Sequence, residues 1–116
     1  MNTIKIYHNP RCSKSRKTLE IIESTGAMPE VIKYLETPPT VSEIKSVLAL
    51  LNLKPRELMR KGESEYTDNN FSDDSLSDDE LIQLMIKYPK VIERPIVLSN
   101  GKAVIGRPPE SVMDII

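Results

Sequence analysis

The residue in this chain most able to do chemistry is its single cysteine, Cys12. It lies between a predicted strand and a predicted helix, so its sulfur should sit at a helix N-terminus. The unpaired N–H groups and the positive dipole end of a helix favour an anion there, and a thiolate is such an anion. Arg11, Lys14 and Arg16 flank the cysteine, and nearby cations favour the thiolate further. We therefore interpret Cys12 as a reactive nucleophile rather than an inert buried cysteine, the commonest role of a lone one.

Two neighbours could assist this cysteine. His8 lies just upstream and could stabilise the thiolate when protonated, or orient a proton. Ser15 lies three residues after Cys12, where its hydroxyl can donate a hydrogen bond to the sulfur. Cys12, His8 and Ser15 are therefore the candidate catalytic residues.

Spacing separates this site from other kinds of cysteine chemistry. A phosphatase loop needs an arginine six positions after the cysteine, where this chain has Thr18. A dithiol oxidoreductase needs Cys-x-x-Cys, and Ser15 occupies the second position. A cysteine protease needs a paired histidine from elsewhere, and His8 is the only histidine. A monothiol redox site is the interpretation that fits best.

The lone thiol also predicts a partner. Two-electron reduction of an oxyanion or a disulfide needs more than one thiol in total, so a further thiol must come from outside, such as glutathione or a glutaredoxin. One cysteine and one histidine exclude an internal disulfide and give no metal-ligand spacing. We expect no bound cofactor and no metal, with glutathione as a co-substrate.

Length, composition and net charge indicate what kind of protein carries this cysteine. A chain of 116 residues has the usual size of one domain, so we expect a single domain over residues 1–116 and a monomer. A net charge of −1 gives no argument for a nucleic acid or a membrane surface. The longest apolar run, Val47–Leu51, is too short to cross a bilayer, and the N-terminus lacks the layout of a signal peptide. A cytoplasmic location is expected.

Hydrophobic periodicity and turn signals predict the elements that position Cys12. Capping boxes formed by Thr40 with Glu43 and by Ser77 with Glu80 mark two helix starts, and Asn100-Gly101 marks a hairpin turn. The predicted strands cover residues 3–7, 30–34, 96–98 and 103–105. Helices are predicted over residues 13–25, from residue 40, over 55–62, from residue 77 and from residue 108.

The order of these elements predicts the fold. Strand, helix and strand within about thirty residues form a βαβ unit with parallel strands. The hairpin and a final helix, with Val112, Met113 and Ile116 facing inward, complete the other half. We predict an α/β thioredoxin-like fold (βαβ plus ββα) with a four-stranded mixed sheet and a helical insertion between its two halves.

Several motifs resemble one family, the glutaredoxin-linked arsenate reductases (ArsC). The similarity covers almost the whole chain in the same order, which is more specific than any single motif. The motifs are residues 8–16 (HNPRCSKSR), 34–39 (YLETPP), 57–60 (ELMR), 93–97 (ERPIV) and 105–110 (IGRPPE).

The resemblance implies a function. In that family a cysteine attacks arsenate and forms a covalent thiol adduct, glutathione enters, glutaredoxin resolves the mixed species, and arsenite leaves. Cys12 matches this cysteine, and Arg60, Arg94 and Arg107 match the family's anion-binding arginines. The resemblance thus implies arsenate reduction in arsenic detoxification. Pro95 matches the cis proline that thioredoxin-like folds place beside the active cysteine.

The chain departs from the family pattern directly after the cysteine. Well-studied arsenate reductases have Gly-Thr there, and this chain has Ser13-Lys14. A small residue lets the loop wrap tightly around an oxyanion, whereas Lys14 adds bulk and charge. Two alternatives therefore stay open. One is a related monothiol oxidoreductase acting on another oxyanion or on glutathione mixed disulfides. The other is a non-enzymatic regulator of the Spx type, although Ser15 replaces the second cysteine of the Cys-x-x-Cys pair that such proteins often use.

Overall fold

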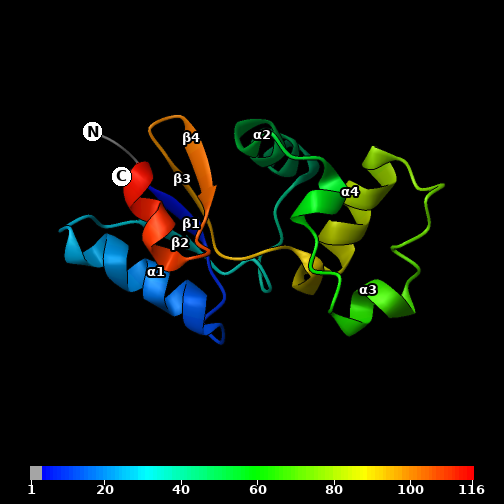
Figure 1. Ribbon diagram of the computed structural model, residues 1–116, viewed down its shortest axis with the longest axis horizontal. Helices are drawn as coiled ribbons and strands as arrows, with labels where there is room; N and C mark the ends of the chain where they lie inside the picture. The colour runs from blue at the N-terminus through cyan, green and yellow to red at the C-terminus, as the bar shows by residue number, and fades with distance from the viewer. Residues whose placement is uncertain (1–3) are drawn as a thin grey trace. The chain divides into compact units, whose positions relative to one another are not determined.

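The computed structural model describes residues 4–116, which form two compact units (Figure 1). The sheet unit comprises the chain up to Thr37 together with Arg94–Ile116, and the helical unit comprises Pro38–Glu93. The sheet unit contains β1 (Lys5–Tyr7), α1 (Ser13–Ser24), β2 (Glu30–Ile32), β3 (Ile96–Ser99), β4 (Lys102–Ile105) and the 3₁₀ helix η3 (Pro109–Asp114). The helical unit contains α2 (Val41–Leu51), η1 (Pro55–Leu58), α3 (Ser64–Asp68), α4 (Asp78–Lys87) and η2 (Pro89–Val91). The single-domain organisation expected from chain length stays a prediction.

The four strands form one mixed sheet in the order β2-β1-β3-β4. β1 is parallel to β2, with Ile6 opposite Val31, and antiparallel to β3, with Ile6 opposite Val97. β3 and β4 are antiparallel and joined by the predicted turn, where Asn100 and Gly101 both have positive φ (56° and 70°). This arrangement confirms the predicted thioredoxin-like sheet and the helical insertion between its halves.

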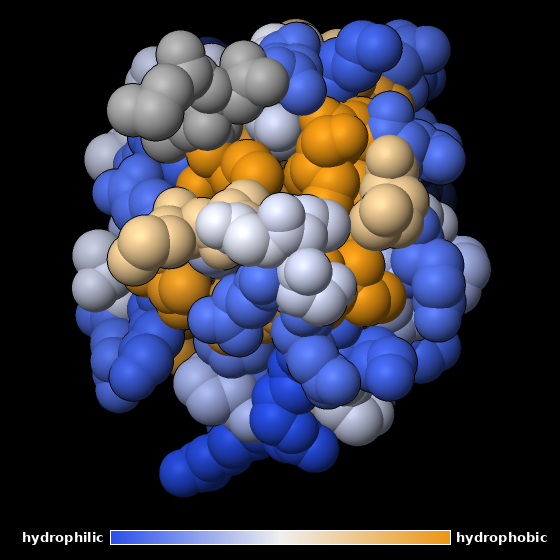
Figure 2. Space-filling model, turned by 90° about the vertical axis from the view of Figure 1, so that its left-hand side faces the viewer, coloured by the Kyte–Doolittle hydropathy of each residue, from blue (hydrophilic) through white to orange (hydrophobic). Residues whose placement is uncertain are grey.

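The core of the sheet unit lies between the sheet and the helices α1 and η3, which pack against each other (Figure 1). Its buried members come from β1, β3, α1 and η3 and from the residues next to β1 and η3: Ile4, Ile6, Ile22, Val97, Val112 and Ile115. Other apolar side chains, including Leu19 and Ile116, are only partly buried against this cluster. Figure 2 shows a face on which apolar side chains reach the surface among hydrophilic ones.

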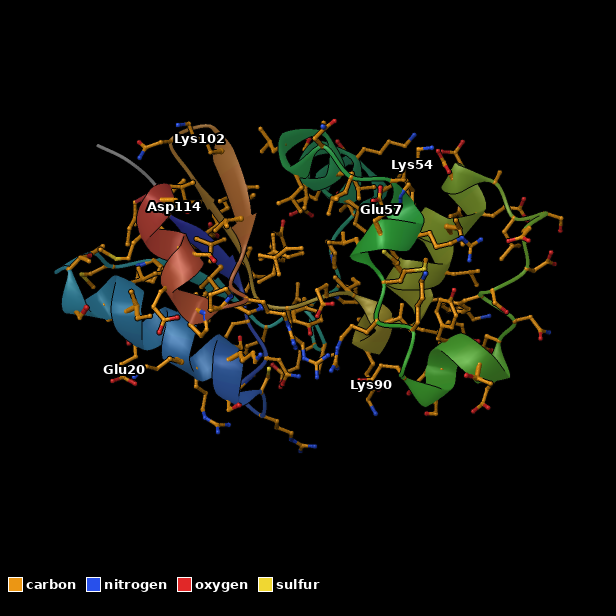
Figure 3. All side chains as sticks on the ribbon, in the orientation of Figure 1. Glu20, Lys54, Glu57, Lys90, Lys102 and Asp114 are labelled. Carbon is orange, nitrogen blue, oxygen red and sulfur yellow. The ribbon has the colours of Figure 1, made fainter. Side chains whose placement is uncertain are left out.

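In the helical unit, the helix starts follow the predicted capping boxes. Thr40 Oγ1 accepts from the backbone N–H of Glu43 at 3.2 Å, and Ser77 Oγ accepts from that of Glu80 at the same distance. At the start of η1, the Glu57 carboxylate accepts a hydrogen bond from the backbone N–H of Lys54, the N-cap residue, at 2.9 Å (Figure 3). No helix within residues 4–116 combines the length and the apolarity needed to cross a membrane.

Several predicted boundaries and one predicted core residue differ from the structure. The helix predicted over residues 55–62 ends at Leu58, and α3 and η2 are additional short helices. The last helix is 3₁₀, with about three residues per turn, so Val112 and Ile115 share its inner face. The prediction that Met113 faces inward is therefore wrong, because its side chain is 53% exposed. The predicted strand start at Thr3 lies outside the described residues.

Candidate active site

Cys12 is the N-cap residue of α1, as the sequence predicts. Its backbone is extended (φ −96°, ψ 122°), its N–H donates to the Asn9 carbonyl, and its carbonyl accepts from the Arg16 N–H, both at 3.0 Å. The sulfur is half-buried and does not cap the helix through a hydrogen bond. No acidic residue lies in the first turn of α1. The start of α1, with its unpaired N–H groups, therefore lies at a partly exposed cysteine.

Ser15 is fully buried and joins α1 to the end of β1. Its Oγ accepts a hydrogen bond from the Asn9 backbone N–H at 3.0 Å and lies 2.6 Å from Nδ1 of His8. The sequence predicts that this hydroxyl donates to the Cys12 sulfur, and among the described residues no such hydrogen bond occurs. The hydroxyl lies instead against the His8 imidazole nitrogen and the Asn9 N–H.

His8 directly follows β1 and is buried, with its side chain inside the site. Burial lowers the pKa of His8 from its usual value, the charges of Lys33 and Arg16 lower it further, and Glu23 opposes them. The imidazole is therefore neutral at pH 7, and Nδ1 shares one hydrogen bond with the Ser15 hydroxyl, whose direction is set by which ring nitrogen carries the hydrogen. His8 is thus a neutral, hydrogen-bonded ring and not a permanent cation.

The loop between β1 and α1 is held in place by two further hydrogen bonds. Asn9 Oδ1 accepts from the Arg11 backbone N–H at 3.0 Å, and Arg16 Nη1 donates to the Pro10 carbonyl at 2.9 Å. Sequence reasoning did not single out Asn9 for this role. The Asn-Pro pair could have indicated it, because asparagine side chains favour such local turns.

Arg94 and Arg107 lie side by side in the sheet unit, each before a cis proline. Arg107 Nε donates to the Arg94 carbonyl at 3.1 Å, and the Gly106 N–H donates to the Pro95 carbonyl at 2.9 Å. The cis bond at Pro95 confirms the geometry that the resemblance implies.

These two loops also lie against α1, through two residues that sequence reasoning missed. A Cβ on Gly106 would lie 2.5 Å from Thr18 Oγ1 and 2.7 Å from Pro95 Cγ, so only glycine fits there. Thr18 is buried on α1, six residues after Cys12, which corresponds to roughly 9 Å along the helix axis. This contact anchors the Arg94 and Arg107 loops beside the first half of α1.

Arg60 belongs to the helical unit, where it is half-buried between two carboxylates. Its guanidinium is ion-paired with Glu63, and its Nε lies 3.6 Å from Glu93 Oε1. The positive charge of Arg60 is thus already compensated within its own unit. Its role in binding an anion stays a prediction.

Nothing in the described residues resembles a metal site. Within residues 4–116, no three histidine, cysteine or acidic side chains gather so that they could hold a metal ion. The groups with chemistry to offer are one partly exposed thiol, one neutral imidazole and the arginines Arg94 and Arg107, whose loops pack against α1.

Comparison with known proteins places the chain in a family. Residues 7–115 match the ArsC family. The protein YfgD of Escherichia coli K12 is 53% identical over 97% of this chain and 96% of its own length. An arsenate reductase of Neisseria meningitidis is 44% identical, with 97% of each chain covered. The structure of an arsenate reductase from Vibrio cholerae superposes with a TM-score of 0.95 at 51% identity, covering 98% of each chain. A half-buried cysteine at a helix start, two paired arginine–cis-proline loops and this end-to-end similarity identify the chain as a member of the ArsC family.

Proposed function

We propose that this protein reduces arsenate to arsenite with electrons from glutathione, through a covalent adduct on Cys12 that glutaredoxin helps to resolve. The observation that carries the proposal is the position of Cys12, accessible at the N-cap of α1 with no acid in the first turn. The relatives named arsenate reductases support the choice of substrate.

The proposed reaction assigns a task to each part of the site. The Cys12 thiolate attacks the arsenic atom, and one oxygen of arsenate leaves as water after taking up protons. Arg94 and Arg107 hold the remaining oxygens, because planar guanidinium groups match an oxyanion with paired hydrogen bonds. Arg60 is proposed as a third anion-binding residue. His8, neutral and held by Ser15, accepts or returns a proton near the sulfur.

The electrons come from outside the chain. Two glutathione thiols give up two electrons and two hydrogens and end as a disulfide, while arsenic goes from the pentavalent to the trivalent state and loses one oxygen as water. The only cysteine of the chain cannot form an internal disulfide, which supports an external thiol and a glutaredoxin as the resolving partners. We further propose that the protein acts as a monomer in the cytoplasm, where such thiols are kept reduced.

A coupled assay tests the proposal. Purified protein receives arsenate, glutathione, glutaredoxin, glutathione reductase and NADPH, and NADPH consumption is followed. We expect an arsenate-dependent rate that Cys12→Ser abolishes. A rate no higher than that of Cys12→Ser would reject the proposal.

A second measurement tests the anion site without turnover. Arsenate should protect Cys12 from alkylation by iodoacetamide, and Arg94→Ala should weaken that protection. Unchanged protection in Arg94→Ala would remove this arginine from the anion site.

A second candidate function rests on Ser13 and Lys14, which are both exposed in the first turn of α1. An added cation and the loss of a small residue suit a larger, anionic disulfide substrate, such as a glutathione mixed disulfide, better than a tightly wrapped oxyanion. A glutathionylated peptide turned over faster than arsenate would favour this candidate. Turnover of neither would reject both.

A further inference from the structure

A cavity of about 300 Å³ opens beside the loop that leads to Cys12. It lies at the carboxyl ends of the parallel strands β1 and β2, where the His8 N–H donates to the Ile32 carbonyl at 2.8 Å. Ligands of α/β proteins commonly bind at the carboxyl ends of parallel strands, and the volume is at the lower end of the range of about 300–1,000 Å³ for small-molecule sites. The cavity lies entirely within the sheet unit.

The charged groups around the cavity form a specific pattern. Two cations, Arg11 and Lys33, and one carboxylate, Glu36, line it together with Leu35, and the buried His8 reaches its wall. A ligand that complements them carries two anionic groups and one cationic group. An inorganic oxyanion has no cationic group, so Glu36 would repel it.

The walls of the cavity are held in place before any ligand arrives. Asn9 Oδ1 fixes the turn that carries Arg11 at 3.0 Å. The Lys33 carbonyl accepts from the N–H groups of Glu36 and Thr37, both at 2.9 Å, which fixes the turn that carries Lys33 and Glu36. Preformed walls lower the entropic cost of binding.

We infer that this cavity binds glutathione, with its two carboxylates at Lys33 and Arg11 and its ammonium group at Glu36. The inference rests on the proposed function, since it names the place from which the co-substrate thiol approaches Cys12. Glutathione at neutral pH carries this set of charges on a small peptide frame. Arg11, which lines the cavity, directly precedes Cys12 in the chain.

Binding is measured with S-methylglutathione, whose blocked thiol cannot react, by isothermal titration and by amide chemical shifts of the full chain. We expect shifts in residues 8–11 and 33–37. Lys33→Ala should weaken binding about tenfold, the loss of one charge-assisted hydrogen bond. Lys33 is exposed, and only its backbone carbonyl holds the turn, so the variant should fold.

Lys102 offers a matched control, because it is also an exposed lysine of the sheet unit. It begins β4, on the edge strand opposite β2, and lies at the hairpin shown in Figure 3. Lys102→Ala should bind S-methylglutathione like the unaltered chain. Equal affinities of Lys33→Ala and Lys102→Ala, or shifts confined to other residues, would overturn the inference.

Two further measurements distinguish a site for the tripeptide from a site for a simple anion. Glu36→Gln should weaken S-methylglutathione and strengthen sulfate, because it removes the partner of the ammonium group and the repulsion of an oxyanion. Sulfate shifting the same residues with higher affinity than S-methylglutathione would show a plain anion site and overturn the inference.

The coupled assay keeps this inference distinct from the proposed function. If the inference holds, Lys33→Ala raises the KM for glutathione and leaves the KM for arsenate unchanged. An arsenate-dependent rate with unaltered glutathione KM in Lys33→Ala would defeat the cavity assignment alone. The absence of any rate above Cys12→Ser would defeat the proposed function, while the binding titration would still decide on the cavity.

Discussion

Ser15→Ala is the substitution whose effect follows most directly from the structure. Ser15 is completely buried, and its Oγ is the partner of both the Asn9 N–H and His8 Nδ1. Alanine would leave these two buried polar groups without that partner. Each such group costs about 1–3 kcal/mol, so the expected loss in unfolding free energy is about 2–6 kcal/mol. Against a typical total of about 5–15 kcal/mol, this is a large fraction.

The assay is urea unfolding followed by circular dichroism, with amide hydrogen exchange at Asn9 as a local measurement. The Asn9 amide should be protected in the unaltered chain and exchange much faster in Ser15→Ala. Ser24→Ala is the control on the same helix, because the Ser24 hydroxyl makes an exposed hydrogen bond to the Ile21 carbonyl at 2.6 Å. Its effect should stay within about 0.5 kcal/mol.

The reasoning would be refuted by equal unfolding free energies for the two variants together with unchanged Asn9 protection. That result would mean that the Asn9 amide finds another partner and that the serine does not hold the loop. Alkylation of Cys12 gives a third reading, because a loosened loop should change the reaction rate of the sulfur in Ser15→Ala and not in Ser24→Ala.

Three further predictions concern other parts of the chain. Gly106→Ala should lower the unfolding free energy by about 1–3 kcal/mol in urea unfolding, because its Cβ would overlap Thr18 Oγ1. Gly62→Ala, with open space around it, should lower it far less. Equal losses would contradict the close packing. Ser77→Ala should lower the unfolding free energy by about 1 kcal/mol through loss of the α4 cap, and an unchanged value would show that the cap contributes nothing. Burial lowers the pKa of His8 in the folded chain, so the unfolded chain takes up the proton first as pH falls. The stability present above the pKa of the unfolded state is therefore lost as pH falls towards and through the pKa of the folded state. His8→Gln should make this loss shallower in urea unfolding at successive pH values, and an identical pH dependence would contradict it.

The features that sequence predicts well here are the ones determined by local chemistry. The capping boxes at Thr40 and Ser77 form as predicted, because N-cap and N3 side chains lie within reach of each other whatever surrounds them. The positive φ values at Asn100 and Gly101 follow in the same way from residues that tolerate that conformation. Cys12 at the start of α1 needs only a strand end and a helix start.

The features that sequence missed depend on contacts between distant segments. Gly106 carries no helix or strand signal. Glycine is required there only because Thr18 and Pro95 lie against it and leave no room for a side chain. Met113 faces solvent because the last helix is 3₁₀, and a spacing of 3.6 residues assigns it to the wrong face. Ser15 shows the same limit, since its spacing from Cys12 allows a contact with the sulfur but does not show that His8 competes for the hydroxyl.

The shared hydroxyl of Ser15 has a consequence for how protons move. When Nδ1 carries no hydrogen, the oxygen receives one hydrogen from the Asn9 amide and gives its own to the imidazole. A ring that gains a proton at Nδ1 would instead point a hydrogen at that oxygen, so the serine would have to turn its own hydrogen away. Charging of the histidine and reorientation of the serine hydroxyl are therefore one event. Each proton taken up would rotate the O–H dipole of Ser15, which lies in the first turn of the helix that begins after Cys12.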